Sequence, residues 1–300
     1  MIKILIVHHK PTQLLKNDVF TPIRVGAALS TETNDFDDNV LSDADGENIS
    51  AKNPTYNELT AIYWAYKNYE KLGDPDYLGL MHYRRFFIFE PRKYAYYEQK
   101  NFDNIENAIK ANNLTEDLLD ACDFVAPMPN PRKSVYQSYS ASHHKEDIDL
   151  ALEIISNKHP GFYDTAKEYV SSQADFFYNM FILKKSDFFD YCNFLFSVME
   201  EYEQKTTHKS ERFFISEILT GIFFAHLINN GKKPLLLPVL YIGKKPSFKQ
   251  SVAECKRNFK ENTSGFLFKI KPLIVFFTPN FILLKRKRKT AKIKNKNASV

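Results

Sequence analysis

The sequence predicts an α/β fold, a sheet flanked by helices, and two observations support this. The 300-residue chain is 44% apolar and 15% aromatic, which is enough to bury a large core. Short apolar runs alternate with longer segments whose apolar residues recur at helical spacing, an order typical of a sheet covered by helices. Strands are expected at 2–7, 77–83, 123–126, 177–183 and 235–240.

The first strand, 2–7, is too short for the core of a signal peptide and is not followed by a small-residue cleavage site. Residues 31–53 are polar and predict a loop. Thr55 and Glu58 have the spacing of a capping box, and the apolar residues after them predict a helix from Leu59. This helix leads into the strand at 77–83.

The second half of the chain repeats this alternation. Residues 127–142 follow a strand and begin with three prolines, so they predict a long loop that covers a site and moves. Further helices are expected at 102–112, from Thr115 onward, at 144–157, at 162–172, after a possible N-cap at Ser186, and at 215–228. One domain is expected to span 1–260, followed by a basic amphipathic extension over 261–300.

Cysteine usage and charge limit the class of protein. Three widely spaced cysteines suggest neither a disulfide framework nor a thiolate zinc site, and they fit a reducing cytoplasm. The formal net charge is +5, and residues 285–300 hold eight Lys or Arg and no acid. The positive charge is therefore concentrated in the extension.

The segment before these basic residues, 266–284, is rich in Phe, Ile and Leu. It is interrupted by Lys269, Lys271, Pro272 and Pro279, so it is expected to lie on a membrane and not to cross it. Anionic lipid attracts such cations by roughly 1 kcal/mol each. We therefore predict that the extension binds an anionic membrane surface. A solvated, disordered tail is the alternative, and nucleic acid is not an expected partner because no recognition module is present.

The residues with the most distinctive chemistry lie where the strand at 77–83 ends. His82, Arg84 and Arg85 follow a short apolar run. Ligands collect at the carboxyl ends of strands in open α/β sheets, and the planar guanidinium group matches phosphate oxygens two at a time. These residues therefore predict a site for a phosphate-bearing ligand.

Several motifs together resemble a known family. They are Asn48-Ile-Ser50, Asn53, the run from Asn57 to Trp64, the run from Gly79 to Arg85, His143 to Asp147, Asn179 to Lys184, and Ser216-Glu217. Across residues 1–240 the chain resembles the bacterial capsular and exopolysaccharide glycosyltransferases long catalogued as a domain of unknown function. The resemblance implies a nucleotide-sugar-dependent enzyme of the GT-A type. Its Rossmann-type mixed sheet would bind donor and acceptor at the carboxyl edge.

Sugar transfer needs charge to stabilise a leaving diphosphate and a carboxylate to accept a proton. Many GT-A enzymes hold the diphosphate with an Asp-x-Asp motif and a divalent metal. Here the strand ends in His82-Tyr83-Arg84-Arg85, and guanidinium charge can replace a metal. No cofactor is therefore expected, and a divalent metal is the alternative. Asp35-Phe-Asp37 and Asp43-Ala-Asp45 lie in the polar loop and are interpreted as solvated turn acids.

Two acids are candidates for the catalytic base. Glu217 is the leading candidate, because an acid in an otherwise apolar helix is expected to have either a hydrogen-bond or ion-pair partner or a function. Asp175 is the second candidate, with an exposed turn acid as the alternative. Asn179 resembles the sugar-pocket Asn of glycogenin-like GT-A enzymes, and its alternative role is to cap a strand or turn.

Histidines and lysine complete the predicted site. His9 and Lys10 follow the first strand, where the nucleotide usually sits in such sheets. His143, His144 and Asp147 begin a helix whose N-terminus favours an anion such as the donor phosphate, although at least one of these histidines is expected to cap the helix or face solvent. A zinc site is not expected there, because no pair has i, i+4 spacing. The predicted substrate-binding residues are His9, Lys10, Asn48, Asn53, His82, Tyr83, Arg84, Arg85, His143, His144, Asp147 and Asn179.

The sequence thus predicts a hexosyltransferase in the cytoplasm, peripheral on the inner face of the plasma membrane. It would transfer galactose or galactofuranose from a UDP-linked donor to a lipid-linked oligosaccharide in capsule, exopolysaccharide or O-antigen synthesis. A phosphate-processing enzyme could use the same Arg pair, but the chain has no phosphate-loop pattern. A non-catalytic membrane-surface protein would leave that pair without a role.

Overall fold

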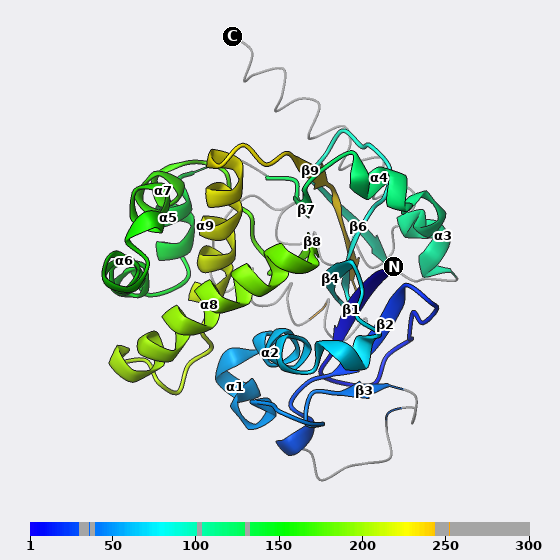
Figure 1. The fold of residues 1–300 in the computed structure, drawn as a ribbon, viewed down its shortest axis with the longest axis horizontal. Coiled ribbons are helices and arrows are strands. Elements are labelled where there is room, and N and C mark those ends of the chain that lie inside the picture. The colour runs from blue at the N-terminus through cyan, green and yellow to red at the C-terminus, as the bar shows by residue number, and fades with distance from the viewer. Residues whose placement is uncertain (30–35, 37–39, 101–103, 130–132, 244–251, 253–300) are drawn as a thin grey trace. The chain divides into compact units, whose positions relative to one another are not determined.

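The computed structural model of the chain describes residues 1–29, 36, 40–100, 104–129, 133–243 and 252 (Figure 1). The chain divides into two compact units, Met1–Tyr96 with Ile105–Val239 and Tyr97–Asn104 with Leu240–Val300. In the second unit, β6 (Tyr96–Lys100) pairs with β10 (Val239–Gly243). The domain boundary predicted near residue 260, and the extension after it, lie outside the described residues and stay predictions.

The described part of the first unit contains a mixed sheet in the order β3-β2-β1-β4-β8-β7-β9. The strands are β1 (Ile2–His8), β2 (Phe20–Arg24), β3 (Leu41–Ser42), β4 (Tyr77–His82), β7 (Phe124–Pro127), β8 (Phe181–Lys184) and β9 (Pro234–Leu237). β1 runs parallel to β2 and β4, whereas β8 runs antiparallel to β4 and β7. After a tight turn β4 returns as β5 (Arg85–Phe87), with His82 opposite Arg85. The predicted α/β fold with a mixed sheet is confirmed.

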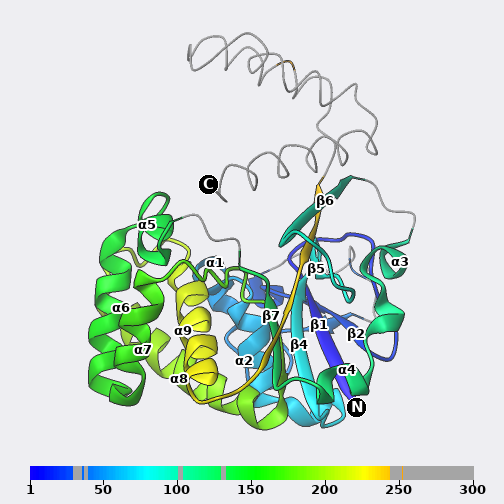
Figure 2. The same cartoon turned by 90° about the horizontal axis from the view of Figure 1, so that it is seen from above.

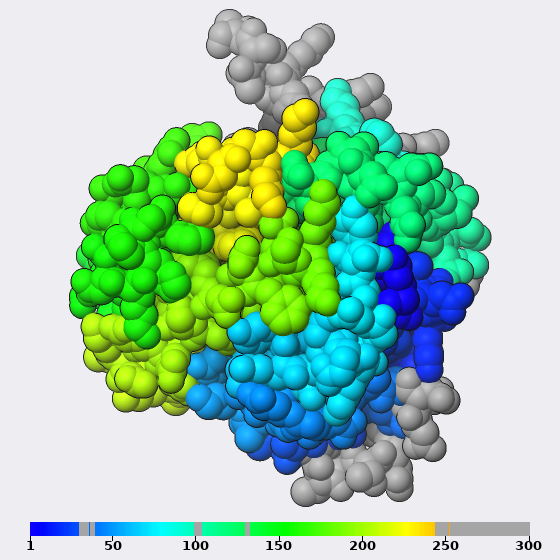
Figure 3. Space-filling model, viewed as in Figure 1, coloured from blue at the N-terminus to red at the C-terminus, as the bar shows by residue number. Residues whose placement is uncertain are grey.

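Helices cover both faces of this sheet. Figure 2 shows α3 and α4 on one side of β1 and β4, and α2 and α9 on the other. The space-filling view shows α2 and α8 side by side at the surface, in agreement with their packing contact (Figure 3). The helices are α1 (Asn53–Tyr56), α2 (Leu59–Lys67), α3 (Ile105–Ile109), α4 (Glu116–Asp120), α5 (Val135–Ser140), α6 (Lys145–Lys158), α7 (Pro160–Ser171), α8 (Lys185–Lys205) and α9 (Ile215–Asn229), with 3-10 turns at Ala27–Leu29, Ser50–Lys52, Tyr69–Leu72 and Ala111–Asn113.

The apolar run of β1 reflects burial on both faces of the sheet. Leu5 and Val7 join the main core, together with residues of α2, α8 and α9. Ile4 and Ile6 are fully buried as well but point to the opposite face, because side chains alternate along a strand. A strand covered on both faces reads as a continuous apolar run, which is why this element was predictable.

Several predicted boundaries were wrong. The strand predicted at 177–183 begins at Phe181, because Tyr178 and Asn179 have positive φ angles of 87° and 49° and form a turn. The strand predicted at 235–240 is divided between β9 and β10. The predicted loop at 31–53 contains β3, and the predicted loop at 127–142 contains α5.

The predicted capping box does not form. α1 ends at Tyr56, and Asn57 has a positive φ of 51°, so the chain turns before α2 begins. Glu58 precedes α2 but makes no side-chain cap there. Its carboxylate instead accepts a hydrogen bond from Asn179. The helix expected after Ser186 starts at Lys185 instead.

Among the described residues, no helix is both long and apolar enough to cross a bilayer. The predicted membrane-binding segment falls on residues that the structure does not describe, so this prediction is untested.

Gly79 lies in the middle of β4, between Ile4 of β1 and Ile182 of β8. An added Cβ would lie 2.9 Å from Ile4 Cγ1 and 3.0 Å from the Phe181 carbonyl oxygen. Gly79→Ala is therefore expected to lower the free energy of unfolding by about 1–3 kcal/mol, through overpacking. Denaturant titration measures this. The control is Gly161→Ala, where an added Cβ meets no atom within 4 Å; an equal loss in both variants would contradict the packing argument.

Candidate active site

The carboxyl ends of β1 and β4 lie side by side, because the two strands are parallel and Val7 pairs with His82. His82 donates a hydrogen bond from Nε2 to the backbone carbonyl of Tyr178, at 2.6 Å. Burial lowers the pKa of His82, so the ring is neutral and this bond fixes which nitrogen carries the proton. His82 thus ties the end of β4 to the turn before β8.

A group of cationic side chains surrounds Tyr83 in the turn after β4. His9 meets the Tyr83 ring edge-on, with centroids 5.0 Å apart, and Lys10 Nζ and Arg84 Cζ lie 5.8 Å and 6.0 Å from the ring centroid. Partial burial lowers the pKa of His9, and the charges of Lys10, Arg212 and Arg84 lower it further. We call Lys10, Arg84 and Arg212, together with His9 and Tyr83 beside them, the cationic cluster; its positive charge comes from the lysine and the two arginines. Such a concentration of positive charge attracts an anion.

Arg212 was not among the predicted site residues. It lies in the segment before α9 and contributes its charge to a cluster built from the ends of β1 and β4. In the sequence it stands next to Glu211, and this local pattern of two adjacent charges does not indicate a site. Only the fold shows that its charge lies within electrostatic range of His9.

Glu217 lies in the first turn of α9 and is half-buried. Burial and the nearby Glu58 carboxylate raise the pKa of Glu217 to about 7, while a hydrogen bond from the Tyr178 backbone and the charge of Arg85 act in the opposite direction. Arg85 Cζ lies 4.8 Å from the Tyr178 ring centroid. A carboxyl group with a pKa near neutrality can accept a proton in its ionised form and release it afterwards.

The two neighbouring arginines therefore lie in different environments. Arg84 belongs to the cationic cluster, whereas Arg85 lies against Tyr178 and acts on His82 and Glu217. The difference follows from the tight turn, after which Arg85 starts the returning strand opposite His82.

Asn179 is fully buried and holds Glu58 in place. Its Nδ2 donates to Glu58 Oε1 at 2.8 Å and to Ser216 Oγ at 3.0 Å, and its Oδ1 accepts from Thr220 Oγ1 at 2.6 Å. Both amide hydrogens are thus used within the protein. Asn179 lies in the turn before β8, but its side chain bonds to Glu58 and to two residues of α9 and not to that turn. Its predicted contact with sugar hydroxyls stays a prediction. Glu58 was missed as a site residue because its spacing from Thr55 indicated a helix cap.

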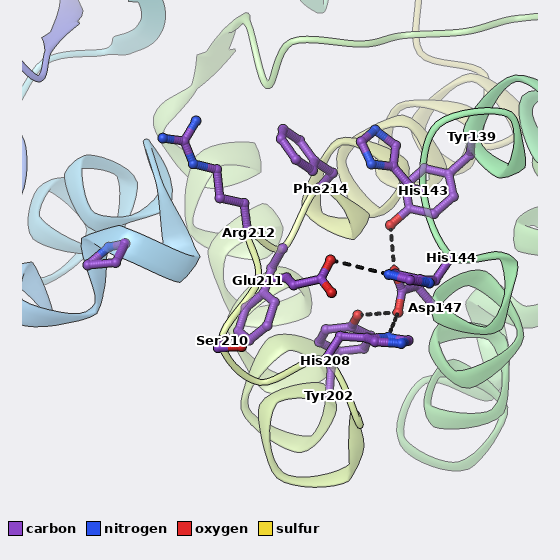
Figure 4. A pocket seen from close by; sticks show the side chains of 12 residues that line it. Tyr139, His143, His144, Asp147, Tyr202, His208, Ser210, Glu211, Arg212 and Phe214 are labelled. Carbon is purple, nitrogen blue, oxygen red and sulfur yellow. Dashed lines mark hydrogen bonds and ion pairs between the residues drawn. The ribbon is translucent and has the colours of Figure 1, made fainter.

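A pocket of about 350 Å³ lies between α5, the start of α6, the end of α8 and the segment before α9 (Figure 4). Asp147 is buried there and accepts hydrogen bonds from Tyr139 OH at 3.0 Å and Tyr202 OH at 2.6 Å. The lining residues are Pro54, Tyr139, His143, His144, Asp147, Tyr202, His208, Ser210, Glu211, Arg212, Phe213 and Phe214. We call this the histidine pocket.

Aromatic rings form part of its wall. His143 stacks on Phe214 with centroids 4.4 Å apart, and His144 stacks on His208 at 3.7 Å. Burial lowers the pKa of His143. His144 Nε2 lies 3.2 Å from a carboxylate oxygen of Glu211. His143, His144 and Asp147 thus line one pocket, and their predicted role in binding the donor phosphate stays a prediction.

The other predicted residues have varied positions. Asn48 donates to the carbonyls of Ala44 and Gly46, at 2.9 Å and 2.8 Å, and so shapes its own loop. Asn53 donates to the Asn57 carbonyl at 2.6 Å. Neither contributes to the cationic cluster. Asp175 is half-buried, and burial, Glu217 and Asp175 together raise the pKa of Tyr178, so both carboxylates act on the same ring.

The interpretation of the loop acids as solvated turn acids is wrong for Asp43. It is fully buried and accepts hydrogen bonds from the backbone N–H groups of Gly26 and Ala27, at 2.9 Å and 3.1 Å, and from Ser50 Oγ at 2.5 Å. It therefore stabilises a turn and is not solvated. Asp35 lies outside the described residues, as does Asp37.

Within the described ranges, no three His, Cys, Asp or Glu side chains are grouped as metal ligands. Metal-independent chemistry stays a prediction, with its test given below.

Comparisons with known proteins agree with this architecture. The model of a family described as a domain of unknown function (DUF4422) matches residues 3–229. The chain is also similar to the solved apo structure of the bifunctional glycosyltransferase WbbM, with a TM-score of 0.72 and 26% sequence identity over 81% of this chain. It covers 45% of that protein, less than half its length. No curated protein sequence matches the chain.

Proposed function

The chain belongs to the DUF4422 family, and we propose that this member is a glycosyltransferase that uses a nucleotide-sugar donor. The single observation that carries the proposal is the position of Glu217. A carboxyl group with a pKa of about 7 lies at the sheet edge that also carries the cationic cluster. The similarity to the bifunctional glycosyltransferase WbbM supports the same reaction class.

In this proposal the donor diphosphate binds the cationic cluster. Positive charge stabilises the diphosphate as the bond between its oxygen and the anomeric carbon breaks. Glu217 accepts the proton of the acceptor hydroxyl, whose oxygen forms the new bond to the anomeric carbon. The proton thus ends on Glu217 and the negative charge on the nucleoside diphosphate. Arg85 and Glu58 set the pKa of Glu217 in opposite directions.

The proposal also covers the donor sugar, the acceptor and the place of the reaction. We propose a UDP-linked hexose, galactose or galactofuranose, as the donor and a lipid-linked oligosaccharide as the acceptor. The enzyme would act at the inner face of the plasma membrane in capsule, exopolysaccharide or O-antigen synthesis. The family resemblance of the sequence and the basic residues of 285–300 support these assignments.

Incubation with individual nucleotide sugars tests the proposal. We expect slow release of UDP from one UDP-hexose, because water can replace the acceptor. Release of inorganic phosphate instead would favour a phosphate-processing enzyme, which the cationic cluster could also serve. Neither product, with no binding of UDP at millimolar concentration, would contradict an enzyme of either kind and favour a non-catalytic membrane-surface protein.

A further inference from the structure

We infer that the histidine pocket binds the acceptor glycan, as an uncharged polyhydroxylated ring, and not the donor phosphate. The inference rests on the proposed function. It assigns a ligand to the histidine pocket, which the proposed reaction leaves without a role. It also changes the role predicted for His143, His144 and Asp147, from the donor to the acceptor.

The charges of the pocket argue against an anionic ligand. Asp147 is buried in the first turn of α6, the position where an anion would meet the helix N-terminus, so a carboxylate already occupies that place. Glu211 adds a second carboxylate near His144. Figure 4 shows Glu211 directed toward His144, whereas Arg212 points away from the histidines. A phosphate group in the pocket would lie beside two carboxylates, and the nearby imidazoles are already used, since His208 Nδ1 lies 3.4 Å from Asp147 and His144 pairs with Glu211.

The remaining groups suit a sugar ring. His143 and Phe214 stack on each other and both line the pocket, so aromatic rings form a weakly polar part of its wall, which suits the C–H groups of such a ring. Ser210 and Glu211 are exposed and line the same pocket, so they can exchange hydrogen bonds with hydroxyl groups. Pockets that combine aromatic walls with a few polar groups are typical of small-molecule sites.

The pocket borders both parts of the proposed active site. The Glu217 backbone N–H donates to the Phe214 carbonyl at 3.1 Å, so the proposed base follows the aromatic wall by three residues. Burial and Asp147 are the main causes that raise the pKa of Tyr139, which lines the pocket, and the charge of Glu217 adds to them. Arg212 lines the pocket and lies within electrostatic range of His9. The pocket is therefore linked to Glu217 through Phe214 and to the cationic cluster through Arg212.

Saturation-transfer NMR with p-nitrophenyl glycosides of glucose, galactose and mannose tests the inference on the full chain. We expect at least one glycoside to bind the wild type, and His143→Ala to weaken it by at least about tenfold, which corresponds to ~1.4 kcal/mol. Glu211→Gln, at an exposed position, should weaken binding without affecting folding. The matched control is His226→Ala, because His226 also stacks on a phenylalanine, Phe162 at 3.8 Å, but outside this pocket.

The outcomes separate this inference from the proposed function. Unchanged glycoside binding in both pocket variants, or no binding by the wild type, would overturn the inference. Equal weakening in His226→Ala would overturn it too. Titration with UDP is measured separately. Glycoside binding without any UDP binding would overturn the proposed function and support the ligand class of the pocket.

Discussion

Glu217→Gln is expected to lower the rate of sugar transfer by about 10²–10⁴-fold, the usual contribution of a positioned base. Gln has nearly the shape of Glu but cannot accept the proton of the acceptor hydroxyl. The rate of UDP release, measured with and without a glycoside acceptor, gives the result. An active Glu217→Gln enzyme together with an inactive Glu58→Gln enzyme would transfer the role of base to Glu58.

The pH dependence provides a second signature of the same residue. Because the pKa of Glu217 is about 7 and the base must be ionised, the rate is expected to rise with pH through neutrality. Glu58 is the nearby carboxylate that raises this pKa, so Glu58→Gln should move the rise to lower pH. A profile that is flat across neutral pH would contradict the assignment.

The free energy of unfolding shows whether Glu217→Gln loses activity because catalysis is lost or because the protein is less stable. The pKa of Glu217 is raised in the folded state from 4.5 to about 7, so the neutral carboxyl is the form that folding favours. Its contribution to stability is complete below pH 4.5 and is lost as the pH rises through 7. Gln stays neutral at every pH. Glu217→Gln should therefore be at least as stable as the wild type above pH 7, as denaturant titration would measure.

The sheet could be predicted where burial leaves a clear pattern. β1 and β4 are apolar runs because both of their faces are covered, and the polar residues that follow them, His9 and Arg84, mark the ligand edge. β2 was missed because its sequence, Phe-Thr-Pro-Ile-Arg, contains a proline and two polar residues. Its pairing with β1 decides its conformation, and single-segment patterns do not contain that information.

Several residues of the candidate site could be predicted one at a time, but their spatial neighbours could not. Glu217 was recognisable as an acid in an apolar helix, yet the neighbours that raise its pKa come from segments far away in the chain. Glu58 looked like a helix cap, and its true partner, Asn179, lies 121 residues further on. Adjacent positions in sequence suggested one shared role for Arg84 and Arg85. In the structure Arg84 lies near the Tyr83 ring and Arg85 near the Tyr178 ring, and their shared role in binding phosphate stays a prediction.

Arg84→Ala is expected to lower kcat/KM for the nucleotide sugar by about 10²–10³-fold, the effect of removing one group that stabilises developing charge. Arg84 lies beside Tyr83 in the cationic cluster and acts on His9 together with Lys10 and Arg212. The other cations cannot fully compensate, because each originates from a different segment with its own geometry. Affinity for UDP should fall as well, and the loss should shrink at high salt, where all such contacts are screened.

The control is Arg92→Ala, since Arg92 pairs with Glu90 and does not belong to the cluster. It should leave turnover and UDP affinity near wild-type values. A chelator added to the wild type should have little effect if fixed cations neutralise the diphosphate. Strong inhibition by the chelator, with full recovery on adding a divalent metal, would show that an ion performs this task. Arg84 would then orient the donor, and its replacement would raise KM more than it lowers kcat.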